Sequence, residues 1–320
     1  MAITTPINSE SIITINHNEK MKTKYLAFAA LAAIVASCSN HEEFIPQDNL
    51  KDTPISVTAG VAELATRTGY EGTSVLPETF YLSITQDTED AASRYNYTNV
   101  LMTKGADNAY TSTDNLLWKN SNRDVAINAY TTDATTFTVQ TDQSTTDGVL
   151  ASDLLGAVRA ADNSDISVSE DNISINFRHL LCKLDVTYTW GTEFNNATTK
   201  TIKSVVYQGF GTDVTLDREA CTVTNGTASA DIKAYVNKLT SEAIFAPYVS
   251  EAPKIVITTT IDGVDRVYSI GVTAPADGFA SGNRYTMNVT IGGTSVENGS
   301  VTATIANGWG ESITGNMATN

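Results

Sequence analysis

Residues 254–270 read KIVITTTIDGVDRVYSI and carry the clearest fold signal in the 320-residue chain. A run rich in β-branched residues leads into the dipeptide Asp262-Gly263, a strong hairpin-turn sequence, and a second such run returns from it. Alternation with a period of two residues recurs along most of the chain, whereas few segments offer ten residues of helical spacing. The sequence therefore predicts an all-β protein.

The remaining strand candidates are spaced as in β-sandwich proteins. About seven candidates precede residue 170 and about seven follow it, and seven strands suit one sandwich. We therefore expect two β-sandwich domains, at residues 55–165 and 166–320, with the boundary at the polar stretch 160–165. No short repeat of fixed period is visible, which argues against a propeller.

The composition excludes several classes of function. The chain has 20 basic residues (Lys and Arg) and 36 acidic residues (Asp and Glu), which give a formal charge of −16. Nucleic-acid binding relies instead on clustered basic residues. Three cysteines are too few for a disulfide scaffold, and three histidines are too few for most histidine-based metal sites. We expect no nucleic-acid partner, no metal and no cofactor, and a binding or structural protein rather than an enzyme.

The N-terminal residues predict export. An apolar run at 25–35 follows three lysines and is shorter than the ~20 residues of a membrane-spanning helix, as in a secretory signal. It ends in Val35-Ala36-Ser37-Cys38, which looks like a bacterial lipobox. We predict that residues 1–37 are removed and that Cys38 is lipidated. The alternative is an ordinary secretory signal followed by a chance cysteine.

The flanks of this signal give two further expectations. Residues 1–20 fit poorly upstream of it, so we predict that Met21 is the true start or that these residues leave with the signal. The acidic stretch 39–43 resembles the surface-export signal of Bacteroidetes lipoproteins, although an ordinary solvated tether is the alternative. We expect a tether at 38–54 and a surface-exposed lipoprotein of the outer membrane.

Other reactive or aromatic residues have structural explanations. His179 is the only histidine after the tether and no G-x-S-x-G elbow exists, so we expect a structural histidine. Cys182 and Cys221 could form a disulfide in an exported protein, or remain buried thiols.

Three tryptophans leave a binding role open. Trp118, Trp190 and Trp309 could form a sugar-binding platform, although packing in the core or at a strand edge accounts for them as well.

Several stretches, taken in their order along the chain, resemble one known family. They are the lipobox at Cys38, Ala65-Thr66-Arg67-Thr68-Gly69-Tyr70, Leu116-Leu117-Trp118 with 125–130, the strand 175–184, the stretch 278–285, and Trp309. This series resembles the Bacteroidetes fimbrillin family (Mfa-like and FimA-like subunits of type V pili). The resemblance covers nearly the whole chain from residue 38.

The resemblance implies a fold, a role and partners. It implies two transthyretin-like β-sandwich domains in tandem and a structural or adhesive subunit of a cell-surface fimbria, without catalysis. The implied partners are other fimbrillin subunits, an Arg-specific protease, the outer membrane through the lipid anchor, and a ligand on host or bacterial surfaces.

The implied assembly mechanism is proteolytic loss of the first strand, followed by strand addition from the next subunit. On this sequence the departing strand would present Ile55, Val57, Ala59 and Val61 on one face, and Arg67 would be the cut site. The alternative is a permanent first strand and an ordinary loop arginine at position 67.

The C-terminal tail leaves the position in a pilus open. A stalk subunit needs a long alternating donor strand, but only eleven residues follow Trp309, with Ile313 and Met317 as the larger apolar ones. A tip or accessory subunit is therefore as well supported as a stalk subunit. A different class also stays open, a surface glycan-binding lipoprotein serving a nutrient transporter, because fold alone does not separate the two.

Overall fold

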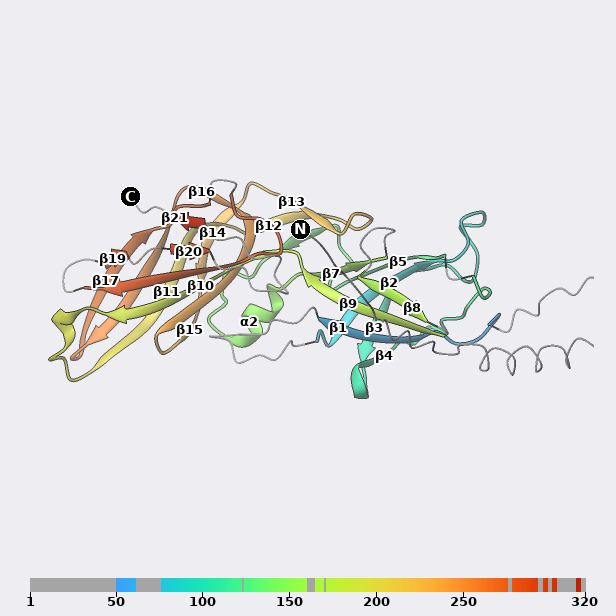
Figure 1. Cartoon of the computed structure of the whole chain (residues 1–320), viewed down its shortest axis with the longest axis horizontal. Helices are drawn as coiled ribbons and strands as arrows, with labels where there is room; N and C mark the ends of the chain where they lie inside the picture. The colour runs from blue at the N-terminus through green and yellow to red at the C-terminus, as the bar shows by residue number, and fades with distance from the viewer. Residues whose placement is uncertain are drawn as a thin grey trace, which may run out of the picture. The chain divides into compact units, whose positions relative to one another are not determined.

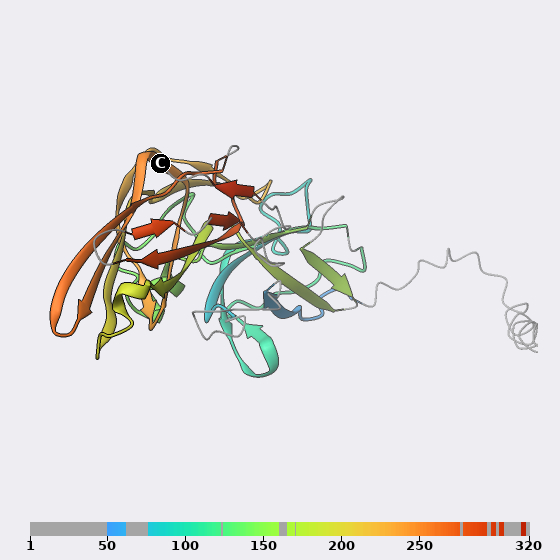
Figure 2. The same cartoon turned by 60° about the vertical axis from the view of Figure 1, so that its left-hand side comes forward.

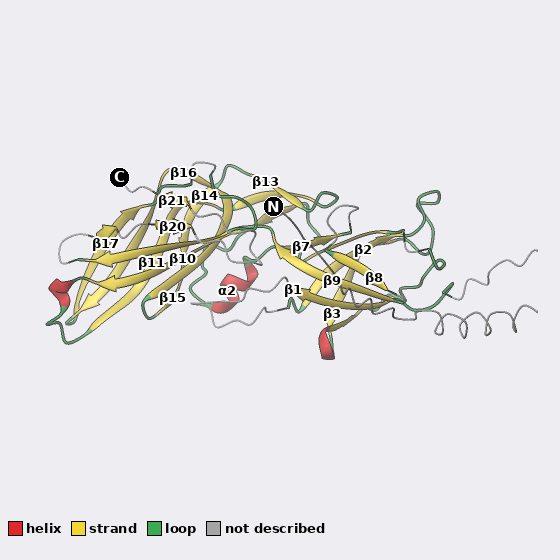
Figure 3. Ribbon diagram, viewed as in Figure 1, coloured by secondary structure: helices red, strands yellow, loops and turns green. Residues whose placement is uncertain are grey.

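A computed structural model describes residues 50–61, 76–122, 124–159, 165–169, 171–275, 278–292, 296–298, 301–303 and 315–317, which lie in one compact unit. Nearly all regular structure in these residues is strand (Figures 1 and 3). The exceptions are the helix α2 (Thr146–Ala151) and the 3-10 turns η1 (Ala106–Asn108) and η2 (Thr192–Phe194). The predicted all-β class is confirmed.

The first sheet has eight strands, seven of which form a closed ring of pairings. The strands are β1 (Ser56–Val61), β2 (Thr79–Thr85), β3 (Tyr97–Lys104), β4 (Ala109–Thr111), β5 (Ala126–Tyr130), β7 (Leu155–Val158), β8 (Ile166–Ser169) and β9 (Asn172–His179). Their order is β1-β4-β3-β2-β5-β7-β9-β8, and β1 also pairs with β9, which closes the ring and leaves β8 attached outside it. The strand β1 is blue and β9 is yellow-green in Figures 1 and 2.

Alternating apolar residues fill the space inside this ring. On β2, Phe80, Leu82 and Ile84 are fully buried while their neighbours are partly exposed. The ring of Phe80 packs against Tyr110 and Phe177, with centroids 4.7 and 5.1 Å apart. The period of two that the sequence displays thus separates the core face from the outer face of each strand.

A second group of strands follows from residue 182. It comprises β10 (Cys182–Trp190), β11 (Lys200–Gly211), β14 (Ser229–Lys233), β15 (Tyr235–Asn237), β16 (Thr240–Ile261), β17 (Val264–Gly271), β18 (Arg284–Ile291) and β19 (Val296–Asn298). The order is β14-β11-β16-β10-β18-β19, with β15 and β17 also paired to β16. The predicted hairpin is present, because β16 pairs with β17 and both turn residues, Asp262 and Gly263, have positive φ.

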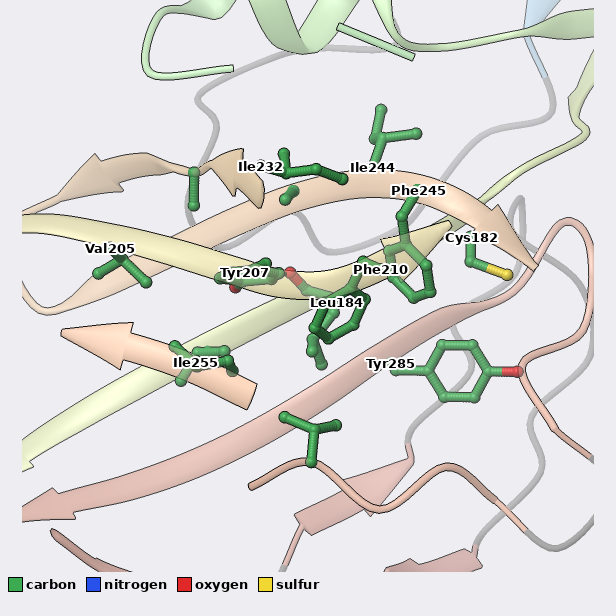
Figure 4. Packing of buried hydrophobic residues seen from close by; sticks show 14 of the residues in the cluster. Cys182, Leu184, Val205, Tyr207, Phe210, Ile232, Ile244, Phe245, Ile255 and Tyr285 are labelled. Atoms are coloured by element: carbon green, nitrogen blue, oxygen red, sulfur yellow. The ribbon is translucent and has the colours of Figure 1, made fainter. Parts of the chain in front are cut away.

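The 22-residue strand β16 organises this second group. Its first part pairs with β10 and its last part with β11 and β17. Aromatic and aliphatic side chains from several of these strands form the core, including Leu184, Tyr207, Phe210 and Phe245 (Figure 4).

The side-chain amide of Gln143 replaces a strand partner at one point of β16. It is fully buried, donates from Nε2 to Ile244 O (2.7 Å), and accepts from Ile244 N at Oε1 (2.8 Å). Both backbone groups of Ile244 are therefore satisfied by one side chain.

Two smaller sheets complete the described structure. One joins β6 (Thr136–Thr138), β12 (Asp213–Asp217) and β13 (Thr222–Asn225), and the other pairs β20 (Val301–Ala303) with β21 (Gly315–Met317).

The division expected after residue 165 falls within the first group of strands. Both β8 and β9 follow that point and still pair within the first group. The change of sheet instead lies at Leu180–Leu181, between β9 and β10. The tandem transthyretin-like arrangement stays a prediction.

Candidate assembly site

The segment 55–61, which contains β1, carries the four residues predicted for the inward face of the departing strand. Val57, Ala59 and Val61 are buried in the first core, and Ile55, just before the strand, is half-buried against it. The burial of this face agrees with the alternation in the sequence. The departure of the strand stays a prediction.

Hydrogen-bonded neighbours lie on both sides of β1. It runs parallel to β9, in register from Ser56 opposite Asn172 to Val61 opposite Phe177. On the other side it is antiparallel to β4, through Val57 opposite Tyr110 and Thr58 opposite Ala109. Loss of β1 would therefore open two facing backbone edges and uncover the apolar positions between them. Such edges are costly when unpaired and are templates for another strand.

The contacts of this segment begin before β1, within the stretch expected to be tether. Asp52 N donates to Trp118 O (2.9 Å), Trp118 N donates to Thr53 O (3.0 Å), and Ile55 N donates to Leu116 O (2.9 Å). Leu50 packs against the first core. The docked segment therefore includes residues 50–54 as well as the strand predicted from the sequence. Residues 50–54 lack the alternation that would have revealed this.

A side-chain cluster fixes Asp52. Tyr95 OH donates to Asp52 Oδ1 (2.7 Å), and Arg94 Nη2 donates to both Asp52 Oδ1 and Tyr95 OH. Tyr95 is buried, whereas the Arg94 and Asp52 side chains are partly exposed. The hydrogen bond to Asp52 and the cost of burial both raise the pKa of Tyr95, so its hydroxyl remains a donor at neutral pH.

Some of the predicted site residues lie outside the described residues. This is so for Cys38, Arg67 and Ile313. Met317 lies on β21, where its backbone is in register with Val301 of β20. The tail segment is thus paired within its own chain.

The tryptophans do not share one surface in the described part of the chain. Trp118 is fully buried in the first core, so its ring has no face available to a sugar. Trp190 is half-buried and meets Phe194 edge-on, with centroids 5.9 Å apart. Trp309 lies outside the described residues.

His179 and the two described cysteines are buried. His179 Nδ1 lies 2.7 Å from Asp153 Oδ1. His179 and Ser281 line one cavity, where the Ser281 hydroxyl donates to Leu180 O (2.6 Å). Cys182 and Cys221 are both free thiols, and burial raises the pKa of each. Raised thiol pKa values oppose nucleophilic chemistry at these positions.

Four charged side chains form a buried cluster on β10, β16 and β18 that the sequence reading missed. Lys183 pairs with Glu242 and, at 3.4 Å, with Asp185, while Arg284 pairs with the other oxygen of Asp185. Burial raises the pKa of Glu242 although Lys183 opposes this. Residues 183 and 185 of a strand share a face, but alternation does not identify the charged side chains of other strands that meet them.

Within the described residues, no group of three or more His, Cys, Asp or Glu side chains could hold a metal ion. No helix in the described part of the chain has the length and apolar character that crossing a membrane requires.

Comparisons with known proteins agree with this architecture. Residues 66–309 match a family model described as fimbrillin-like. A putative cell adhesion protein from Bacteroides uniformis is 21% identical, with a TM-score of 0.54, covering 79% of this chain and 96% of that chain. Another from Bacteroides ovatus is 14% identical, with a TM-score of 0.59, covering 80% and 97%. These two likenesses show the fold. No curated protein matches the chain.

Proposed function

The chain belongs to the fimbrillin-like family, and we propose that it is a structural or adhesive subunit of a cell-surface fimbria that assembles by strand exchange. In this proposal the protein is exported as a lipoprotein on Cys38 and reaches the outer surface with β1 in place. An Arg-specific protease then cuts after Arg67, and residues 38–67 leave. A strand from another subunit enters between β4 and β9.

One observation carries the proposal: β1 is the strand whose two pairings close the ring, and it directly precedes the proposed cut site. As long as β1 is covalently joined to the rest of the chain, another strand can replace it only if β1 moves out of the ring while still attached. Cleavage after Arg67 turns it into a separate peptide held by noncovalent contacts, among them backbone hydrogen bonds and the burial of three apolar side chains. An incoming strand can restore both kinds of contact, which is the physical basis of strand addition.

The test compares cleavage and polymerisation in matched variants. Wild-type protein treated with a strictly Arg-specific protease should lose residues 38–67 and form a ladder of polymers on a native gel. Arg67→Lys keeps the positive charge but removes the arginine that this protease requires. The variant should therefore stay intact and monomeric. A protease that also cuts after lysine should restore both cleavage and polymers. Polymers from uncut Arg67→Lys protein would refute the proposal, as would wild-type protein that is cut at Arg67 but stays monomeric.

The tail 310–320 is proposed as the donor, with Ile313 and Met317 as its anchors. It would have to leave its pairing with β20 before it could enter a neighbour. A chain lacking residues 310–320 should still accept a strand but not supply one. Added in increasing amounts to wild-type protein during cleavage, it should shorten the polymers. Unchanged polymer length would exclude the tail as donor and favour a different donor segment.

A further inference from the structure

We propose that Asp52, Arg94 and Tyr95 form a latch that retains the departing segment after the chain is cut, so that exchange begins at the opposite end, near Val61. The latch is the cluster of these three side chains. This inference rests on the proposed function, because it concerns how the first strand is held until another replaces it.

The two ends of the departing segment are held unequally. At the Asp52 end, three backbone hydrogen bonds join residues 52–55 to residues 116–118, and Ser56 N donates to Asp171 O (2.9 Å). At the Val61 end, the described pairings of residues 59–61 lie on the β9 side alone, because pairing with β4 stops at Thr58. Among the described residues, those nearest the proposed cut therefore have fewer neighbouring strands than those around Asp52.

The latch adds side-chain bonds at the end that already has more backbone partners. Asp52 Oδ1 accepts from both Tyr95 OH and Arg94, and the bond from Tyr95 is 2.7 Å long. The buried ring of Tyr95 fixes the position of its hydroxyl, so little side-chain entropy is lost when the bond forms. Hydrogen bonds to an ionised carboxylate are stronger than those between neutral groups.

The backbone at Asp52 also points to a role for its side chain. Its φ is +64°, a left-handed conformation that glycine adopts more readily than other residues. A residue with a side chain at this position carries a small conformational cost, which the bonds of its carboxylate to Arg94 and Tyr95 offset.

These contacts give strand exchange a direction. After cleavage, the Val61 end can open while the Asp52 end stays bound, and an incoming strand can pair with β9 from Phe177 backwards. The latch breaks last, once most of the ladder has already been replaced. The apolar interior of the ring is then never left without a strand.

The chain supplies a closely matched control pair. The side chains of Arg94 and Asp52 are 62% and 46% exposed. Those of the ion pair Lys203 and Asp265 are 59% and 47% exposed. Only the first pair links the departing segment to the remainder of the protein. Asp52→Asn and Tyr95→Phe remove latch bonds, and Asp265→Asn removes an equally exposed ion pair elsewhere.

The experiment follows the cut full-length mature protein at a concentration below that for polymerisation. Native mass spectrometry measures how long residues 38–67 remain bound. Asp52→Asn and Tyr95→Phe should lose this fragment roughly 3- to 10-fold faster than wild type, the range expected for one such bond. Asp265→Asn should behave as wild type. Hydrogen exchange of the cut wild-type protein should be faster at residues 59–61 than at residues 52–56.

The outcomes separate the latch from the proposed function. Equal release rates in wild type and both latch variants, equal acceleration by Asp265→Asn, or faster exchange at residues 52–56 would each overturn the latch. In those cases wild-type protein would still polymerise after cleavage at higher concentration. If cut wild-type protein neither released the fragment nor polymerised, the proposed function would fail instead. The exchange measurement needs no variant, so it decides the question even where a substitution prevents folding.

Discussion

Weakening β1 should lower the stability of the intact protein and yet speed its assembly. Val57 is 3% exposed and lies opposite Ile173 on one side and Tyr110 on the other. Val57→Ala removes two buried methyl groups, which costs about 2 kcal/mol once the resulting cavity is included. The free energy of unfolding of uncut protein, measured by urea denaturation, should fall by that amount.

After cleavage the same substitution weakens only the strand that leaves. A loss of about 2 kcal/mol corresponds to roughly 25-fold more frequent opening of the contacts between β1 and its neighbours. Because an incoming strand must displace β1, light scattering after addition of the Arg-specific protease should show polymers forming more than tenfold faster than in wild type.

The control substitution lies on the strand that stays. Ile175 of β9 is 1% exposed and opposite Ala59, so Ile175→Val should cost about 1 kcal/mol. Because β9 must receive the incoming strand as well as hold β1, this variant should polymerise no faster than wild type. If Val57→Ala were less stable in urea but assembled at the wild-type rate or more slowly, β1 would not be the strand that is exchanged.

Three further predictions concern the second group of strands. Lys183→Met should lower the free energy of unfolding in urea by about 3–5 kcal/mol, because it leaves the carboxylates of Glu242 and Asp185 buried without their shared cation. Burial raises the pKa of Glu242, so the native protein should lose stability as the pH rises from about 4.5 through that higher pKa; Glu242→Gln should remove this decline from a pH series of thermal melts. Gln143→Ala should cost about 2–3 kcal/mol in the same urea assay, since the N–H and C=O of Ile244 both lose their partner.

The sequence predicts which side chains face a core better than it predicts which strands meet. Val57, Ala59 and Val61 are buried as their alternation indicates, and Asp262-Gly263 makes the expected turn. Alternation reveals a face and carries no information about the partner. The pairing of β1 with β9, more than a hundred residues later in the chain, closes the ring and could not be read from either segment alone.

Two prolines make β16 difficult to predict from the sequence as one strand. Pro247 and Pro253 lie inside one 22-residue strand, although each lacks the N–H that a ladder requires. The structure accommodates them where the register between β11 and β16 shifts, beside Gly209 with its φ of +78°. A β-bulge interrupts the regular hydrogen-bond ladder, so the residues at those positions need not donate an N–H to it. The sequence alone does not reveal that residues 240–261 form one strand, because the bulge depends on pairing with β11.

The candidate site was only partly predictable for a related reason. Hydrophobic periodicity marks Ile55 to Val61, but Asp52 and Thr53 read as polar tether residues. Their role arises from backbone contacts with Trp118 and from a carboxylate that meets Tyr95. Polar contacts between segments distant in sequence leave no periodic pattern, and the same holds for Lys183 and its partners.

The closed ring explains how one chain can be stable alone and still be prepared to polymerise. An open sheet edge would pair with any available strand, so a subunit carrying one would aggregate during export. In the uncut chain β1 covers the edges of β4 and β9 at once, so this opening is absent from the described ring. Cleavage alone does not create the edge either, because β1 keeps its hydrogen bonds and its buried side chains. The reactive edge exists only while a new strand replaces the old one. A partner strand can therefore pair here only if it can take over the contacts of β1 one residue after another.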